Sequence, residues 1–119
     1  YVFPSESGGR TNARWCAVVG SKCSLVSHPV GSKCFELVNA SHYSHHAIDG
    51  ASHWSELRPE DVTHLYLDHR HMGVGGDDSW SPTVHDEYLI PPSSKHTFGI
   101  RFVPVTSPQD SNHILHPVK

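Results

Sequence analysis

Short apolar runs separated by turn residues follow one another along this chain, and the clearest covers residues 62–71 (VTHLYLDHRH). Apolar and polar residues alternate in this run. One side of it carries Leu65, Leu67, His69 and His71, and the other carries Tyr66, Asp68 and Arg70. A period of two is typical of a strand that is covered on one face, so the pattern predicts a strand over 62–71.

Five other runs predict further strands, each bounded by glycine, proline or serine. They cover residues 14–19, 24–27, 34–39, 85–90 and 96–103. Pro29 is expected to end the second of these, and Pro91 the fourth, because proline cannot donate to a ladder. Several short strands separated by turn signals indicate an all-β fold, an antiparallel β-sandwich.

One short helix is expected between Ser44 and Ala51, where His45, His46, Ala47 and Ile48 lie. Ser44 precedes this segment and can cap its first turn through the hydroxyl. Gly50 limits how far the helix can run. The fold is therefore predicted to contain at most this one helix.

A length of 119 residues suits one domain better than two. We expect this domain to cover residues 1–103. The segment 104–119 begins with Pro104, contains Pro108 and Pro117 and has little apolar material, so we expect a loosely ordered tail there. The first residue is Tyr1 and no signal segment precedes it, which indicates a processed product, a fragment or an incompletely determined sequence.

Charge and cysteine content exclude several classes of partner. A net charge of −3 gives no reason to expect nucleic acid or an anionic membrane, and no apolar run is long enough to span a bilayer. Cys16, Cys23 and Cys34 leave one disulfide bridge possible, but no CxxC pair suggests a zinc site. The triplet at 39–41 is a glycosylation sequon. The compartment stays open.

Three segments resemble the end of the β-galactosidases of glycoside hydrolase family 2. They are YVFPSESGGR at 1–10, FELVNASHYSHHAI at 35–48 and LDHRHMGVGGDDSWSPTV at 67–84. The third is the most specific, because HMG at 71–73 and GGDDSWSP at 75–82 match the family nearly letter for letter. The likeness covers roughly residues 1–103 and is weak between Thr11 and Lys33; the segment after Pro104 has no counterpart.

The resemblance implies a part of the family's last domain, a large antiparallel supersandwich that lends a loop to the active site. In the family, a separate (β/α)₈ barrel carries the two catalytic glutamates. The resemblance therefore implies no catalytic residue and no cofactor here, and a barrel and galactosides as partners. It also implies that Trp80 lines the galactoside pocket. The other residues that we expect at this site are His71, Asp77, Asp78 and Ser79.

The residues themselves allow two interpretations of the loop at 73–82. In one, Trp80 is a core anchor, because burying an indole removes roughly 150–250 Å² from water. In the other, favoured by the motif, it is a platform that faces sugar. Asp77 and Asp78 are adjacent and are poorly placed to flank one glycosidic bond. We expect at least one of them to accept backbone N–H groups and fix the turn instead.

Histidine is unusually frequent, at 12 residues. His42 and His46 are spaced to share a helix face, but no third ligand follows at a suggestive distance, so we predict no metal site. Most of these histidines are expected at the surface.

Three functions remain open from the sequence. The first is a non-catalytic part of a β-galactosidase whose Trp80 loop walls the site and which is not active alone. The second is a free-standing, lectin-like module that binds galactose. The third is an inactive fragment.

Overall fold

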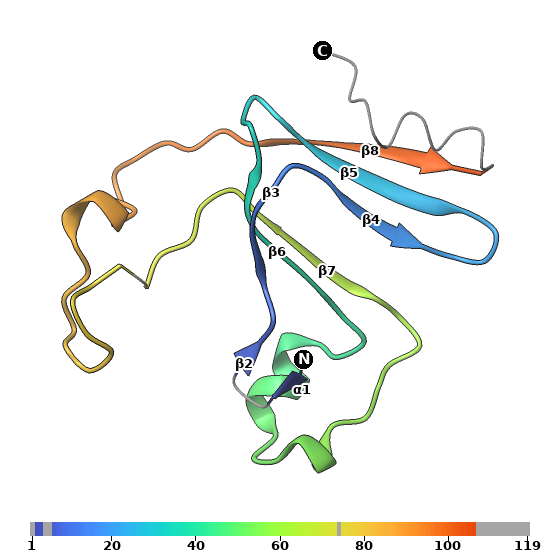
Figure 1. Cartoon of the computed structure of the whole chain (residues 1–119), viewed down its shortest axis with the longest axis horizontal. Helices are drawn as coiled ribbons and strands as arrows, with labels where there is room; N and C mark the ends of the chain where they lie inside the picture. The colour runs from blue at the N-terminus through green and yellow to red at the C-terminus, as the bar shows by residue number, and fades with distance from the viewer. Residues whose placement is uncertain (1, 4–5, 74, 107–119) are drawn as a thin grey trace.

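Two three-stranded antiparallel sheets make up most of this computed structural model, which describes residues 2–3, 6–73 and 75–106 (Figure 1). One sheet has the order β3-β6-β7 and the other the order β4-β5-β8. The strands are β1 (Val2–Phe3), β2 (Glu6–Ser7), β3 (Arg10–Ala13), β4 (Cys16–Val19), β5 (Ser24–Val30), β6 (Phe35–Ser41), β7 (His64–Asp68) and β8 (Gly99–Val105). Strands β1 and β2 form a separate small pair. The predicted all-β, antiparallel sandwich is confirmed.

The chain crosses from one sheet to the other three times at one corner of the fold. Strand β3 leads into β4 across residues 14–15, and β5 leads into β6 across residues 31–34. Gly31 has a φ of 81°, a conformation that only glycine adopts without cost. The third crossing, from β7 to β8, is the long excursion 69–98. The loop that carries the motif is thus inserted where the other two crossings make short bends, and Figure 1 shows it leaving the sheets.

Strand β5 continues through Pro29 to Val30, so the prediction that Pro29 ends this strand is wrong. β4 pairs with β5 only as far as Ser27, which leaves β5 with one described neighbour, β8, at Pro29. Proline is tolerated where one side of a strand is open. The same reason admits Pro104 into the edge strand β8, which reaches the buried Val105. Residues 107–119 lie outside the described residues, and the tail stays a prediction.

Two of the predicted strands differ in the structure. Residues 85–90 do not form a strand, and none of the strands in the described part of the chain pairs with them; Asp86–Tyr88 form a single 3₁₀ turn, η2. Strand β7 is shorter than 62–71, and all five of its residues are half-buried instead of alternating. The ring of His45 stacks on Tyr66 at 3.6 Å between centroids, so the helix partly covers the side that was expected to be polar.

The predicted helix is present as α1 (His45–Gly50). Ser44 has extended backbone angles, and its hydroxyl accepts from the N–H of Ala47 at 3.2 Å, as expected for an N-cap. Glu60 accepts from the N–H of Ser44 at 3.1 Å and bonds His64 at 3.0 Å, which ties the cap to the start of β7. A second 3₁₀ turn, η1 (Trp54–Glu56), was not predicted.

The core is small. Among the residues whose burial is described, the buried apolar side chains are Val26, Phe35, Val38, Ile48, Leu57 and Val105. Phe35 is fully buried and meets Phe98 edge-on at 5.9 Å. The chain exposes 9191 Å², whereas a compact monomer of 13.2 kDa exposes about 6,400 Å². Its radius of gyration is 16.9 Å, against about 13.5 Å for a compact domain of this length.

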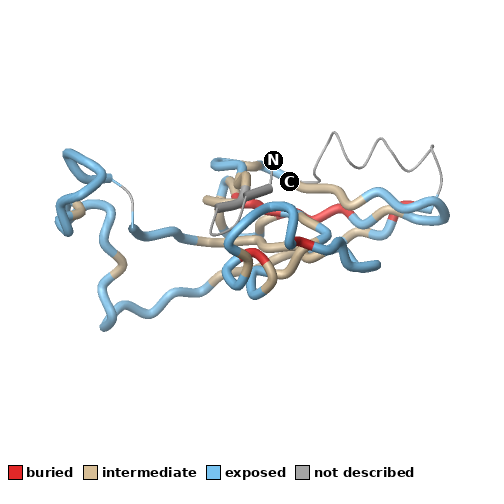
Figure 2. The backbone as a smooth tube through the Cα atoms, turned by 90° about the horizontal axis from the view of Figure 1, so that it is seen from below, coloured by how far each residue is buried: buried red, intermediate tan, exposed pale blue. Residues whose placement is uncertain are grey.

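Figure 2 shows this arrangement edge-on: most of the buried positions lie in the strands, Ile48 lies on α1 and Leu57 follows η1, and the excursion projects away from them. No helix in the described part of the chain is long and apolar enough to cross a membrane.

Candidate functional site

The excursion between β7 and β8 folds back on itself around three glycines. Gly73 and Gly75 have φ values of 115° and 103°, which disfavour any other residue. A Cβ atom on Gly75 would overlap the ring of Tyr88, and one on Gly76 would overlap the carbonyl oxygen of Thr83. The glycine pattern therefore allows the two arms of the excursion to approach each other closely.

Hydrogen bonds join these two arms. The N–H of His85 donates to the carbonyl of Gly75 at 3.1 Å, and the His85 imidazole bonds the carboxylate of Asp77 at 2.9 Å. Nearer the sheets, the N–H of Ile90 lies 3.3 Å from the sulfur of Met72. The loop is thus closed at its base by backbone and side-chain contacts together.

Asp78 fixes the tip of the loop. Its Oδ1 accepts from the N–H groups of Trp80 at 3.0 Å and Ser81 at 2.6 Å, and its Oδ2 accepts from the Ser81 hydroxyl at 2.7 Å. The Ser81 hydroxyl, the Ser81 N–H and the Trp80 N–H together lower the pKa of Asp78. The prediction that an aspartate pins this turn is confirmed for Asp78, whereas Asp77 bonds a histidine side chain.

The indole of Trp80 is 84% exposed, so the interpretation of Trp80 as a core anchor is wrong for this chain. The Asp78 carboxylate accepts hydrogen bonds from the N–H groups of Trp80 and Ser81. The backbone of Trp80 is therefore fixed in the turn while its indole is exposed. Ser79 is exposed at the same tip. His71 is also exposed and lies at the start of the excursion, one residue before Met72.

The carboxylates of the loop are not arranged as a catalytic pair. A glycosidase needs one acid with a raised pKa and a partner across the glycosidic bond. Asp78 is used by the turn, with a lowered pKa, and Asp77 is engaged with His85. Hydrogen bonds also lower the pKa of Glu56, chiefly through the N–H of Ser52, and that of Glu60, chiefly through His64. All these shifts are opposite to what a general acid needs.

The histidines do not gather as their spacing suggested. His42 lies before helix α1, and its Nδ1 is 3.0 Å from the carbonyl of Val62, so it shares no helix face with His46. His69 and His71 were expected on one strand face, but β7 ends at Asp68 and the ring of His69 stacks on Phe98 at 4.9 Å. In the described ranges, no three His, Cys, Asp or Glu residues are grouped as metal ligands.

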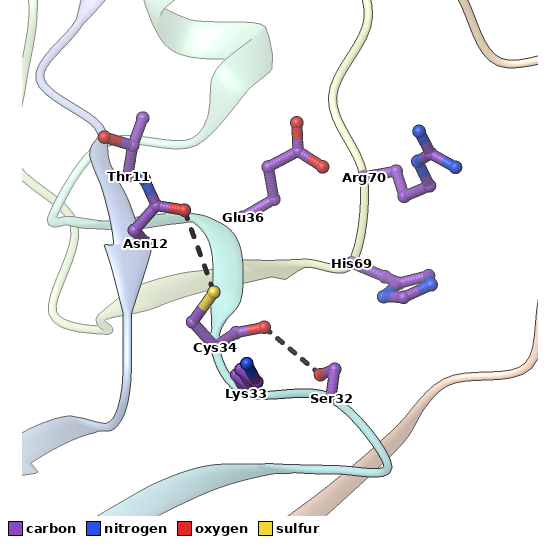
Figure 3. Close-up of a pocket in the computed structure, with 8 residues that line it drawn as sticks. All are labelled: Thr11, Asn12, Ser32, Lys33, Cys34, Glu36, His69 and Arg70. Carbon is purple, nitrogen blue, oxygen red and sulfur yellow. Dashed lines mark hydrogen bonds between the residues drawn. The ribbon is translucent and has the colours of Figure 1, made fainter. Parts of the chain in front are cut away.

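An open cleft of about 570 Å³ was not foreseen from the sequence. It lies beside β3 and β6 and is lined by Thr11, Asn12, Ser32, Lys33, Cys34, Glu36, His69 and Arg70 (Figure 3). The Cys34 thiol lies 3.7 Å from Asn12 Oδ1, and all three cysteines are free. Three segments that are far apart in the sequence, 11–12, 32–36 and 69–70, supply the lining, so no single motif could have predicted this cleft.

Comparison with known proteins gives one family and a consistent set of relatives. The family model described as beta galactosidase small chain matches residues 1–102. A beta-galactosidase of Vibrio cholerae is 43% identical over 110 residues, which are 92% of this chain and 10% of that protein. One from Alteromonas mediterranea is 40% identical over 90 residues, 76% of this chain and 8% of that protein. One from Lactococcus lactis is 38% identical over 96 residues, 81% of this chain and 9% of that protein.

The chain thus spans about a tenth or less of the length of these relatives. No solved structure matches it significantly.

Proposed function

Because this chain belongs to the family of the β-galactosidase small chain, we propose that it completes a β-galactosidase by placing the Trp80 loop against the galactoside site. It supplies no catalytic carboxylate. Catalysis belongs to a barrel elsewhere in the enzyme, and this chain supplies an apolar wall that helps to orient the sugar. The observation that carries the proposal is an indole 84% exposed at the tip of a loop that is braced on both arms.

A braced indole suits sugar binding for a physical reason. One face of galactose carries C–H groups and can lie flat against an aromatic ring. The loop is already ordered by Asp78 and His85, so little conformational entropy is lost when the sugar arrives. Asp77, Ser79 and His71 surround or precede this tip, and we assign them polar contacts to the sugar or to the neighbouring wall. These contacts act only where another surface closes the site, because the tip itself is open to solvent.

The size of the exposed surface favours a part of an enzyme over a free-standing lectin. The chain exposes 9191 Å², about 2,800 Å² more than a compact monomer of its mass. The matched segment is a tenth or less of each relative, so most of the residues of these relatives lie outside it. A module that works alone would gain stability by covering its apolar side chains, whereas this chain leaves many of them in contact with solvent.

A graft tests the role of the loop. The homologous segment of the Vibrio cholerae beta-galactosidase is replaced by this chain, and hydrolysis of a chromogenic β-galactoside is measured. In the graft we expect Trp80→Ala to lower kcat/KM at least about tenfold, equivalent to about 1.4 kcal/mol of lost transition-state stabilisation. Trp54→Ala is the matched control, because Trp54 is 70% exposed on η1, outside the loop.

Both variants should melt at the temperature of the unmodified graft. Equal kcat/KM values for the Trp80 and Trp54 variants would contradict the proposed role of the loop.

The lectin-like alternative makes a different prediction for the chain on its own. One stacked sugar face with few hydrogen bonds corresponds to a Kd around 1 mM, about −4 kcal/mol. Titration of the isolated chain with galactose, followed by indole fluorescence, should show binding no tighter than this, and Trp80→Ala should abolish it. Micromolar binding would favour the free-standing module.

A further inference from the structure

His85 joins the two arms of the excursion, which are residues 75–77 and 82–90. Its N–H donates to the carbonyl of Gly75 at 3.1 Å, and its imidazole Nε2 lies 2.9 Å from Oδ1 of Asp77. A carboxylate has no hydrogen to donate, so Nε2 is the donor in this second bond. The backbone and the side chain of one residue therefore both hold the opposite arm.

Tyr88 and the turn η2 fix His85 on its own arm. The His85 carbonyl accepts from the N–H of Tyr88 at 2.9 Å, so His85 is the residue at which η2 starts. The centroid of the Tyr88 ring lies 6.5 Å from that of the imidazole, at an interplanar angle of 28°. The same ring occupies the space beside Gly75 that a Cβ atom would fill. The imidazole is thus attached to an ordered turn and reaches the carboxylate of the other arm.

Asp78 and His85 fix different features of the loop. Asp78 accepts from groups two and three residues further along the chain, so it determines the shape of the turn 78–81. The bond between His85 and Asp77 joins residues eight positions apart. In the part of the excursion that the structure describes, it is the one hydrogen bond between side chains of the two arms. A turn of fixed shape can still tilt as a unit, so the direction of the Trp80 indole depends on His85 as well as on Asp78.

The side chains of His85 and Asp77 are 50% and 85% exposed. An exposed pair contributes little to the free energy of unfolding, because water competes for both groups. In the proposed function, another surface of the enzyme closes the site around the tip and excludes water, which strengthens the same hydrogen bond. The effect of this pair should therefore appear in substrate binding, with little change in the melting temperature.

We propose that His85 is a positioning residue of the β-galactosidase site: through the Asp77 carboxylate it sets the direction in which the Trp80 indole meets the sugar. This role rests on the proposed function, in which the loop walls the galactoside site. His85 itself does not touch the substrate. The wall supplies contact area and no proton, so tilting it weakens binding of the substrate and of the transition state alike. Loss of the His85 imidazole then raises KM and leaves kcat unchanged.

The graft of this chain into the Vibrio cholerae beta-galactosidase gives the direct test. We expect His85→Ala to raise KM for a chromogenic β-galactoside about three- to fivefold, with kcat changed less than about 1.5-fold. His85→Gln keeps an N–H donor and should return KM to within about twofold of the unmodified graft. His53→Ala is the matched control and should leave KM unchanged. His53 also precedes a 3₁₀ turn, η1, and also bonds a carboxylate, that of Glu56 at 3.4 Å, but outside the excursion.

A double-mutant cycle shows whether His85 acts through Trp80. Once Trp80→Ala is present, His85→Ala should change KM less than about 1.5-fold. A full effect of His85→Ala in that background would overturn the proposal. So would a KM for His85→Ala equal to that of the unmodified graft, or a KM for His85→Gln equal to that of His85→Ala.

The outcomes also separate this role from its premise. If Trp80→Ala leaves kcat/KM intact, the proposed function of the loop fails. If Trp80→Ala lowers kcat/KM while His85→Ala leaves KM unchanged, the function of the loop stands and the positioning role alone is wrong.

A second readout uses the isolated chain in case the graft does not fold. Hydrogen exchange at the N–H of residue 85 reports whether the arms are closed. After correction for intrinsic rates, we expect this N–H to exchange at least about threefold faster in His85→Ala than in His85→Gln. Equal exchange in the two variants would show that the side-chain bond does not close the arms, and the proposal would be wrong.

Discussion

At the tip of the loop, the position of Trp80 depends on one side chain, that of Asp78. Its carboxylate accepts hydrogen bonds from two consecutive N–H groups and from one hydroxyl. The sequence predicted this role because an aspartate two residues before the N–H that it accepts is a local pattern. The sequence could not predict that Asp77, its neighbour, would bond His85, because that contact depends on how the two arms close.

Removing the Asp78 carboxylate should loosen the indole. In a background with Trp15→Phe and Trp54→Phe, we expect Asp78→Ala to lower the fluorescence anisotropy of Trp80, with Asp61→Asn as a control that leaves it unchanged. An anisotropy equal to that of the parent would show that the turn is held by other contacts. The hydrogen bonds of His85 to Gly75 and Asp77 remain in this variant and should keep the base of the loop closed.

The same carboxylate should make the loop sensitive to acid. The pKa of Asp78 in the folded loop is below its ordinary value of 3.8, so its contribution is present at pH values above that range. It is lost as the pH falls through the lowered pKa. We therefore expect the anisotropy of Trp80 to hold down to about pH 4 and to fall below it, with no such step in Asp78→Asn. A step at neutral pH, or the same step in Asp78→Asn, would contradict this role of the Asp78 carboxylate.

At the scale of the elements, predictions that depend on a few consecutive residues were correct, and predictions that depend on neighbouring strands were wrong. The cap at Ser44 and the runs that became β4 and β6 could be predicted because each is decided within a few residues. The strand expected at 85–90 is absent, and no strand among the described residues pairs with this segment. Pro29 was accepted into β5 because β4 ends early, which the sequence around Pro29 does not show.

The cap of helix α1 gives a quantitative test at this scale. Ser44→Ala removes the acceptor for the Ala47 N–H and should lower the free energy of unfolding by about 1 kcal/mol. Ser52→Ala, at an exposed position after the helix, should change it by less than about 0.5 kcal/mol. Urea unfolding followed by tryptophan fluorescence measures both. Equal midpoints for the two variants would show that α1 is held by the stacking of His45 on Tyr66 instead of by its cap.

For the whole molecule, the motif at 71–82 indicated the family most specifically, and the comparisons with known proteins confirm that family. What the motif could not show is where the loop stands in the fold. Only the pairing of Asp68 with Leu37 and of Gly99 with Val30 reveals that the excursion is inserted at the corner between the sheets. The large exposed surface likewise emerges only when the strands are assembled and too few side chains cover them.

We propose that this chain supplies no catalytic group and completes an enzyme whose catalytic groups lie elsewhere. The most direct test of this proposal is turnover of a chromogenic β-galactoside by three samples: this chain, the Vibrio cholerae beta-galactosidase lacking the homologous segment, and their mixture. We predict turnover in the mixture alone, reduced when the chain carries Trp80→Ala. Hydrolysis by the isolated chain that survives repurification, and that is lost on replacing Asp77 or Asp78, would contradict the account.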